Sequence, residues 1–282
     1  MHDAPAAPVN VIENLEYVRR GDEDLSGDLY LPGGAHHAPC LIAAHGGGWQ
    51  RGSPKNYRHL VHYLARHGVA LFAISYRFAP KHRYPAAVHD LRAAIQFIRS
   101  TGGDHGVDPQ RLALIGDSAG GHLAALTALA GDHPDFAGQP DDAYPGVSTQ
   151  VKACVPVYGV YDVAGQWEFD QAFSPAKSAS EVFLGASLVD DPFLFQRASP
   201  LNYVTRANNQ TAFFVSWGAI DDIVNPAAQS HRLLGALKRA EFFVRTCVVE
   251  APHFWLSEPL EEAGSFSGFL APRLLRFLNE RL

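Results

Sequence analysis

The sequence lacks the features of nucleic-acid-binding and membrane-spanning proteins. Its 282 residues carry 23 Lys and Arg against 29 Asp and Glu, a formal net charge of −6 without a basic cluster. We therefore expect neither nucleic acid nor a membrane as a partner. No apolar run approaches the ~18 residues that cross a bilayer, and the first residues lack a basic start followed by an apolar stretch. These absences predict a cytoplasmic protein.

Cysteine is also scarce. Cys40, Cys154 and Cys247 stand singly in apolar runs, with neither the pairing of a secreted disulfide framework nor the spacing of a zinc or redox site. We expect three small buried residues. The 14 histidines show none of the short converging spacings of a metal site, so no metal is expected.

Apolar side chains make up 47% of the chain, enough for one large domain over residues 1–282. Strand-like runs alternate with helical periodicity, which predicts an α/β fold with a mostly parallel sheet. The expected strands are 14–20 and 26–31, as a hairpin, then 40–44, 69–75, 111–115, 151–157, 212–217 and 243–249. The expected helices are 56–66, 85–99, 122–130, 225–240 and 269–281.

Two segments add to this pattern. Residues 161–202 are too long for an ordinary connection and are expected to form a cap over one end of the sheet. The last helix, 269–281, is basic and amphipathic. It could pack on its own sheet or on a second copy of the chain, so a homodimer stays open.

One motif points to nucleophilic catalysis. Gly116-Asp117-Ser118-Ala119-Gly120 fits G-x-S-x-G, in which a strained turn between strand and helix presents the Ser hydroxyl. The alternative is an ordinary glycine-rich turn. A catalytic Ser needs a His as general base and an acid that orients the His. Asp221 or Asp222 follows one predicted strand and His253 follows another, which supplies both.

A glycine loop supplies a fourth element. His45-Gly46-Gly47-Gly48 follows the strand 40–44, and backbone N–H groups on such a loop can stabilise the negative oxygen formed in acyl transfer. We expect Gly47, Gly48 and Ala119 to be the donors. His45 is expected to order the loop, and His122 to be structural or to line the pocket.

These motifs belong to a larger set that carries a family resemblance: His45–Trp49, Ser75–Pro80, Tyr84–Ala87 with Asp90, Gly116–Ala124, Tyr158–Asp162 and Gly218–Asp221. With them the chain resembles α/β-hydrolase serine esterases of the hormone-sensitive-lipase-like group, near bacterial feruloyl/acetyl-xylan-type esterases and kynurenine formamidases. The resemblance implies an α/β-hydrolase fold, with a mostly parallel central sheet flanked by helices and a small cap insertion. It implies no cofactor.

Carried over by position, the resemblance assigns the nucleophile, acid and base to Ser118, Asp221 and His253, and the oxyanion hole to Gly47, Gly48 and Ala119. Asp221 is preferred to Asp222 because it occupies the Asp position of G-x-x-D-x-x-V. Two positions depart from the family pattern. Pro252 stands before His253 where a glycine is frequent, and Lys81 stands where a Glu is frequent.

Substrate contacts are predicted from adjacency to these loops. Trp49 and Trp255 are the candidate substrate-binding residues, and Trp167 and Phe173 are candidate gate residues in the cap. The predicted activity is a serine hydrolase that cleaves carboxylic esters of small or aromatic substrates through an acyl-enzyme intermediate. The alternative is an arylformamidase or a related amidohydrolase, since the same triad cleaves C–N bonds. A sensor with a disabled triad would lack one of the catalytic residues present here.

Overall fold

The computed structural model describes residues 8–137, 142–173, 176 and 178–282. Its strands form one sheet in the order β1-β2-β4-β3-β5-β6-β7-β8. They are β1 (Val9–Arg20), β2 (Glu23–Pro32), β3 (Ala38–Ala44), β4 (Ala70–Ile74), β5 (Val107–Asp117), β6 (Ala153–Val157), β7 (Ala212–Gly218) and β8 (Val244–Val249). Pairing is antiparallel from β1 to β2 and from β2 to β4, and parallel from β4 through to β8. The predicted α/β class, the leading hairpin and the mostly parallel sheet are confirmed.

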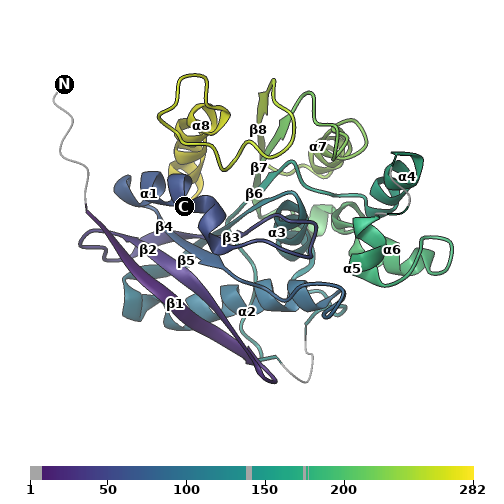
Figure 1. Ribbon diagram of the computed structural model, residues 1–282. Helices are drawn as coiled ribbons and strands as arrows, with labels where there is room; N and C mark the ends of the chain where they lie inside the picture. Colours follow the sequence, from purple (N-terminus) through teal and green to yellow (C-terminus); the bar gives the residue numbers. More distant parts are fainter. Residues whose placement is uncertain (1–7, 138–141, 174–175, 177) are drawn as a thin grey trace.

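Helices cover both faces of this sheet. They are α1 (Arg58–Arg66), α2 (Ala86–Thr101), α3 (Ala119–Ala130), α7 (Ser230–Arg239) and α8 (Phe266–Arg281). Short 3-10 turns accompany them: η1 (Pro54–Tyr57), η2 (Gly102–His105), η4 (Pro200–Tyr203) and η5 (Arg206–Asn208). Helix α1 contacts α8, and α2 contacts α3 on the other side of the sheet (Figure 1). Because both faces are covered, β4, β6 and β7 are buried throughout and read as continuous apolar runs.

One helix begins later than the sequence pattern indicates. The periodicity predicts a helix from residue 225, but α7 starts at Ser230. The side chain of Asn225 accepts hydrogen bonds from the amides of Ala227 and Ala228, at 2.9 and 3.1 Å. An Asn side chain that bonds to the backbone just ahead of it stabilises a turn at the expense of helix.

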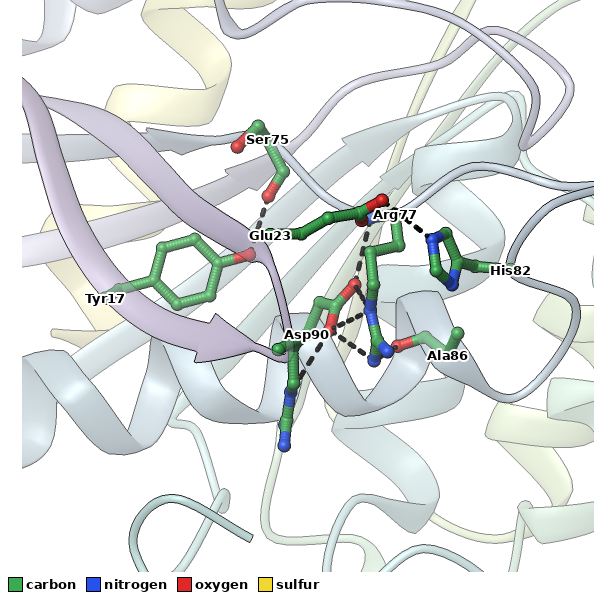
Figure 2. A network of polar contacts seen from close by, with 8 residues as sticks. Tyr17, Glu23, Ser75, Arg77, His82, Ala86 and Asp90 are labelled. Atoms are coloured by element: carbon green, nitrogen blue, oxygen red, sulfur yellow. Dashed lines mark hydrogen bonds and ion pairs between the residues drawn. The ribbon is translucent and has the colours of Figure 1, made fainter. Parts of the chain in front are cut away.

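A buried ion pair attaches the loop after β4 to helix α2. Figure 2 shows Asp90, whose carboxylate accepts bonds from the guanidinium and the backbone amide of Arg77, at 2.7 and 2.9 Å. Arg20 approaches the same carboxylate at 3.7 Å. Burial raises the pKa of Asp90, and the bonds from Arg77 oppose that shift. Nearby, Tyr17 of β1 donates to the carbonyl of Ser75 at 2.6 Å, which joins the hairpin to this loop (Figure 2).

The carboxyl ends of the parallel strands meet at one edge of the sheet. Ala44 of β3 pairs with Gly116 of β5, and Gly218 of β7 pairs with Val249 of β8. In open α/β sheets ligands bind beyond this edge. The loops that follow β3, β5, β7 and β8 are therefore brought together, although they are far apart in the sequence.

The segment expected to form a cap lies beside the main sheet. It contains α4 (Val163–Phe173), α5 (Ala179–Leu184) and α6 (Pro192–Ala198), which group together at one end of the molecule (Figure 1). Residues 174–175 and 177 of this segment, like residues 1–7 at the start of the chain, lie outside the described ones. In the part of the chain that the structure describes, every helix is too short or too polar to cross a membrane.

Candidate active site

Ser118 stands in a strained turn between β5 and α3. Its φ and ψ are 53° and −119°, outside the regions that L residues favour. The flanking glycines of the motif allow the chain to fold this tightly. A Cβ on Gly116 would lie 2.0 Å from the carbonyl oxygen of Gly120, and one on Gly120 would lie 1.8 Å from that of Ala44. The spacing of the motif thus follows from close backbone packing around Ser118.

The loops after β7 and β8 bring an acid and a base to Ser118. The Nε2 atom of His253 lies 3.0 Å from Ser118 Oγ, and its Nδ1 lies 2.6 Å from Asp221 Oδ2. The carboxylate accepts a hydrogen bond from the N–H at Nδ1, so Nε2 carries a lone pair that faces the Ser hydroxyl. Both side chains are almost fully buried. The three residues form one hydrogen-bonded chain that ends on the hydroxyl.

Asp221 is fixed by its second oxygen. Oδ1 accepts hydrogen bonds from the amides of Ile223 and Val224, at 3.0 and 2.9 Å. The neighbouring Asp222 is exposed and lines the cavity described below. Of the two carboxylates considered from the sequence, Asp221 is the one that bonds to His253.

The glycine loop after β3 approaches the N-terminus of α3. Gly47 and Gly48 have φ of 123° and 61°, and a Cβ on Gly47 would meet the carbonyl oxygen of Arg51 at 2.0 Å. Ala119 is the first residue of α3, so its amide has no acceptor within the helix. The amides predicted to form an oxyanion hole thus come from two segments that meet beside Ser118.

Asp117 and Tyr57 support this loop, and the sequence reasoning assigned a role to neither. Asp117 Oδ1 accepts bonds from the amide of Gly46 at 2.9 Å and from the hydroxyl of Tyr57 at 2.7 Å. Burial raises the pKa of Asp117, an effect that these bonds oppose. Asp117 occupies the variable position directly before Ser118, and this adjacency is the one signal in the sequence that could have drawn attention to it.

His45 orders the loop, as predicted. Its Nδ1 lies 2.8 Å from the carbonyl oxygen of Gly46, and its ring stacks on Tyr76 with centroids 4.5 Å apart. The hydroxyl of Tyr76 donates to the carbonyl of His45 at 2.7 Å. Burial lowers the pKa of His45 to about 4, so the ring is neutral near neutral pH. The loop that Arg77 and Asp90 fix therefore also supports the glycine loop through Tyr76.

A cavity of about 760 Å³ opens above Ser118, beneath the cap. Its lining includes Phe169, Asp170 and Phe173 of α4, together with Phe254 and Ile223. Burial raises the pKa of Asp170, which accepts bonds from Gln166 and Ser178. Phe173, a predicted gate residue, is 72% exposed at this cavity.

The predicted substrate-binding tryptophans lie in different surroundings. Trp49 lines the cavity, although its side chain is largely buried. Trp255 is 1% exposed and is not among the described residues that line the cavity. Trp255 packs against Tyr158 within the hydrophobic core. Its predicted contact with the substrate is therefore not supported. Trp167 likewise lies off the described lining and donates to Glu181 at 2.6 Å.

The cysteines and histidines hold no metal site within the described ranges. Cys40, Cys154 and Cys247 are free and buried, as predicted. Burial raises the pKa of Cys40 to about 12, so its thiol stays protonated. Among the described residues, His, Cys, Asp and Glu side chains form no group of three that could hold a metal ion.

Comparison with known proteins shows the family to which the chain belongs. The chain matches the BD-FAE family over residues 27–237. It belongs to that family. It is 34% identical to the esterase LipQ of Mycobacterium tuberculosis over 239 residues, which are 84% of this chain and 52% of LipQ. It is 31% identical to the probable carboxylic ester hydrolase LipM of the same organism, over 80% of this chain and 49% of LipM. The chain thus spans about half the length of these curated relatives.

Solved structures agree on the fold of this BD-FAE chain. The truncated form of a carbohydrate esterase from gut microbiota superposes with a TM-score of 0.80 at 20% identity, covering 99% of this chain and 98% of that one. The esterase Est2 of Thermogutta terrifontis gives a TM-score of 0.74 at 24% identity, covering 98% and 92%. The α/β-hydrolase fold and the resemblance to this esterase group are confirmed. The curated relatives are named as esterases, and they give no support to the arylformamidase alternative.

Proposed function

We propose that the chain is a serine hydrolase that cleaves carboxylic esters of small or aromatic substrates. The observation that carries this proposal is the hydrogen-bonded chain Ser118–His253–Asp221, which ends at a cavity of about 760 Å³. The names of the curated relatives, esterase and carboxylic ester hydrolase, support the same reaction class.

In the first half-reaction Ser118 Oγ attacks the ester carbonyl carbon. His253 Nε2 takes the hydroxyl proton at the 3.0 Å contact, and the carbonyl π electrons move onto oxygen. Asp221 holds the resulting imidazolium in place through Nδ1. The tetrahedral intermediate then expels the alcohol, which leaves with the proton from Nε2. The product is an acyl-Ser118 ester.

In the second half-reaction water replaces the alcohol. His253 takes a proton from water, the hydroxyl oxygen attacks the acyl carbon, and the carboxylic acid departs as Ser118 regains its proton.

In both halves the negative oxygen lies against the amides of Gly47, Gly48 and Ala119. One such donor typically contributes about 10²–10³ in kcat. This assignment is supported by the positive φ values of the loop and by the first amide of α3, which has no acceptor within the helix.

We infer the substrate class from the lining of the cavity. Phe169 and Phe173 pack with ring centroids 4.6 Å apart, and Phe254, which also lines the cavity, is 58% exposed. Such rings favour flat aromatic or short aliphatic groups over polar ones. We expect the small-molecule ester to place its bulkier half against these rings.

The test is steady-state hydrolysis of the acetyl, butyryl, octanoyl and dodecanoyl esters of p-nitrophenol. Turnover should be highest for the short acyl groups and should disappear in Ser118→Ala and His253→Ala. The control variant is His36→Ala, which alters an exposed histidine and should retain full activity. Paraoxon should add one diethyl phosphate group to the peptide that contains Ser118. Turnover that survives Ser118→Ala would refute the proposal.

A further inference from the structure

The glycine loop holds one residue in a conformation that its side chain disfavours. Gly47, Gly48 and Trp49 follow one another with φ of 123°, 61° and 60°. Glycine adopts positive φ freely, whereas Trp does so only when its surroundings hold it there. The conformation of Trp49 therefore depends on contacts outside the loop, and so does the direction of the amides that precede it.

Trp49 is held from two sides. Its indole Nε1 donates to His122 Nδ1 at 3.1 Å. Its ring stacks on Phe183 of the cap helix α5, with centroids 4.6 Å apart and planes 12° from parallel. Stacking fixes the plane of the indole and permits sliding within that plane, whereas the hydrogen bond fixes its position. His122 thus determines where the end of the loop lies.

The partners of His122 define its tautomer. Trp Nε1 can only donate, so His122 Nδ1 must be the acceptor, and the ring proton lies on Nε2. Nε2 lies 2.8 Å from the carbonyl oxygen of Ala198, the last residue of α6, and donates to it. The ring is fully buried, and burial lowers the pKa of His122 to about 4. Both ring nitrogens are satisfied by the neutral form.

His122 also lies on the helix that presents the nucleophile. Its backbone amide donates to the carbonyl of Ser118 at 3.0 Å in the first turn of α3. The proposed oxyanion hole takes Ala119 from this helix and Gly47 and Gly48 from the loop. A contact that joins the helix to the loop sets the distance between the two groups of donors.

We propose that His122 is a positioning residue that acts through Trp49 to hold the amides of Gly47 and Gly48 in register with that of Ala119. The inference rests on the proposed function, because it assigns these amides to the oxyanion hole. A positioning role of this kind makes a prediction that a general packing role does not make. Loss of the Trp49–His122 bond should weaken binding of the transition state while ground-state binding of the ester persists.

Three variants separate the interactions. Trp49→Phe removes the N–H donor and keeps an aromatic ring for the stack on Phe183. His122→Leu removes the acceptor at similar size. His122→Asn places an amide oxygen near the position of Nδ1, so it can still accept from Trp49, although it does not reach Ala198. We expect Trp49→Phe and His122→Leu to lose about tenfold to hundredfold in kcat, which is less than the loss on removing an oxyanion-hole amide outright. His122→Asn should recover much of this loss.

KM for p-nitrophenyl acetate should stay near the parent value in these variants. The double variant Trp49→Phe/His122→Leu should be no worse than His122→Leu alone, because His122→Leu already breaks the bond that Trp49→Phe removes. A trifluoromethyl ketone provides the decisive readout, since its adduct with Ser118 places a negative oxygen in the hole. Its Ki should rise in parallel with the loss of kcat/KM. Thermal unfolding, followed by circular dichroism, separates this effect from loss of the fold.

Trp217→Phe is the matched control. Trp217 is also buried, and it meets His231 edge-on at 5.4 Å, much as Trp49 meets His122 at 5.3 Å. This variant should keep the parent Ki and kcat. If Trp49→Phe folds and also keeps both values, the positioning role is overturned, whether or not His122→Leu folds. Equal losses in His122→Asn and His122→Leu would also overturn it. Activity in Ser118→Ala would instead refute the proposed function itself.

Discussion

Asp221→Asn isolates the part that the acid plays in orienting the base. The amide oxygen of Asn can replace Oδ1 and accept from Ile223 and Val224, so the turn after β7 should survive. The amide nitrogen then takes the place of Oδ2, 2.6 Å from His253 Nδ1, where it can only donate. His253 must accept at Nδ1, and its proton moves to Nε2. That proton points at Ser118 Oγ, so Nε2 has no lone pair to take the serine proton.

The expected loss of kcat is about 10⁴-fold, which corresponds to about 5.5 kcal/mol of activation free energy. The assay is hydrolysis of p-nitrophenyl acetate per mole of folded protein, with the folded fraction taken from urea unfolding. Asp22→Asn is the control, since it changes an exposed carboxylate in the turn between β1 and β2 and should leave kcat close to the parent value. A stable Asp221→Asn enzyme within tenfold of the parent would refute the tautomer argument. So would an equal loss of kcat in Asp22→Asn.

Three further predictions concern stability. Asp90→Ala should lower the free energy of unfolding by about 3–5 kcal/mol, measured in urea, because it leaves the buried guanidinium of Arg77 without its carboxylate. Gly120→Ala should prevent assembly of the turn at Ser118, measured as lost soluble yield and activity, because its Cβ would lie 1.8 Å from the carbonyl oxygen of Ala44. Stability should also fall in acid through His122. Its folded pKa of about 4 lies below the ordinary 6.5, so the unfolded chain binds the proton first and stability is lost from about pH 6.5 down to about pH 4. Between about pH 7.5 and pH 5 this group should cost about 2 kcal/mol in urea unfolding, a loss that His122→Asn should lack.

Control variants and contrary outcomes test these three predictions. Asp24→Ala breaks an exposed ion pair with Arg19 and should change stability little, so an equal loss in both Asp variants would count against the buried-pair argument. Gly103→Ala adds a Cβ with nothing within 4 Å and should fold normally. A parent protein and a His122→Asn variant with the same dependence of stability on pH would contradict the assignment to His122.

The sequence alone predicts the strands whose formation depends on the local pattern of residues. Runs such as 40–44 and 111–115 lie in strands because each is short, mostly apolar and followed within two residues by glycine. Once the sheet is parallel, the ends of its strands share an edge, and the loops that carry Ser118, Asp221 and His253 are expected to meet there. In the structure Ala44 pairs with Gly116 and Gly218 pairs with Val249, so these strands end at the same edge.

Positions that depend on nonlocal packing could not be predicted in this way. Trp49 and Trp255 both adjoin catalytic loops, yet one lines the cavity and the other lies in the core. Adjacency in sequence does not determine which way a side chain turns at the end of a strand. The start of α7 was missed for a different reason, because the turn formed by the Asn225 side chain competes with the helical periodicity that follows it.

His122 shows how chemistry and specificity are coupled in this fold. Its two partners, Trp49 and Ala198, lie 73 and 76 residues away along the chain, on either side of it. Ala198 belongs to α6 and Phe183 to α5, so the cap that lies over the cavity also supports the loop that carries the proposed oxyanion donors. A substitution that reshapes the cap for another substrate therefore also perturbs Trp49. Changes of specificity made through α5 and α6 should thus alter kcat together with KM, whereas changes at Phe173 on α4, which is exposed at the cavity, should act mainly on KM.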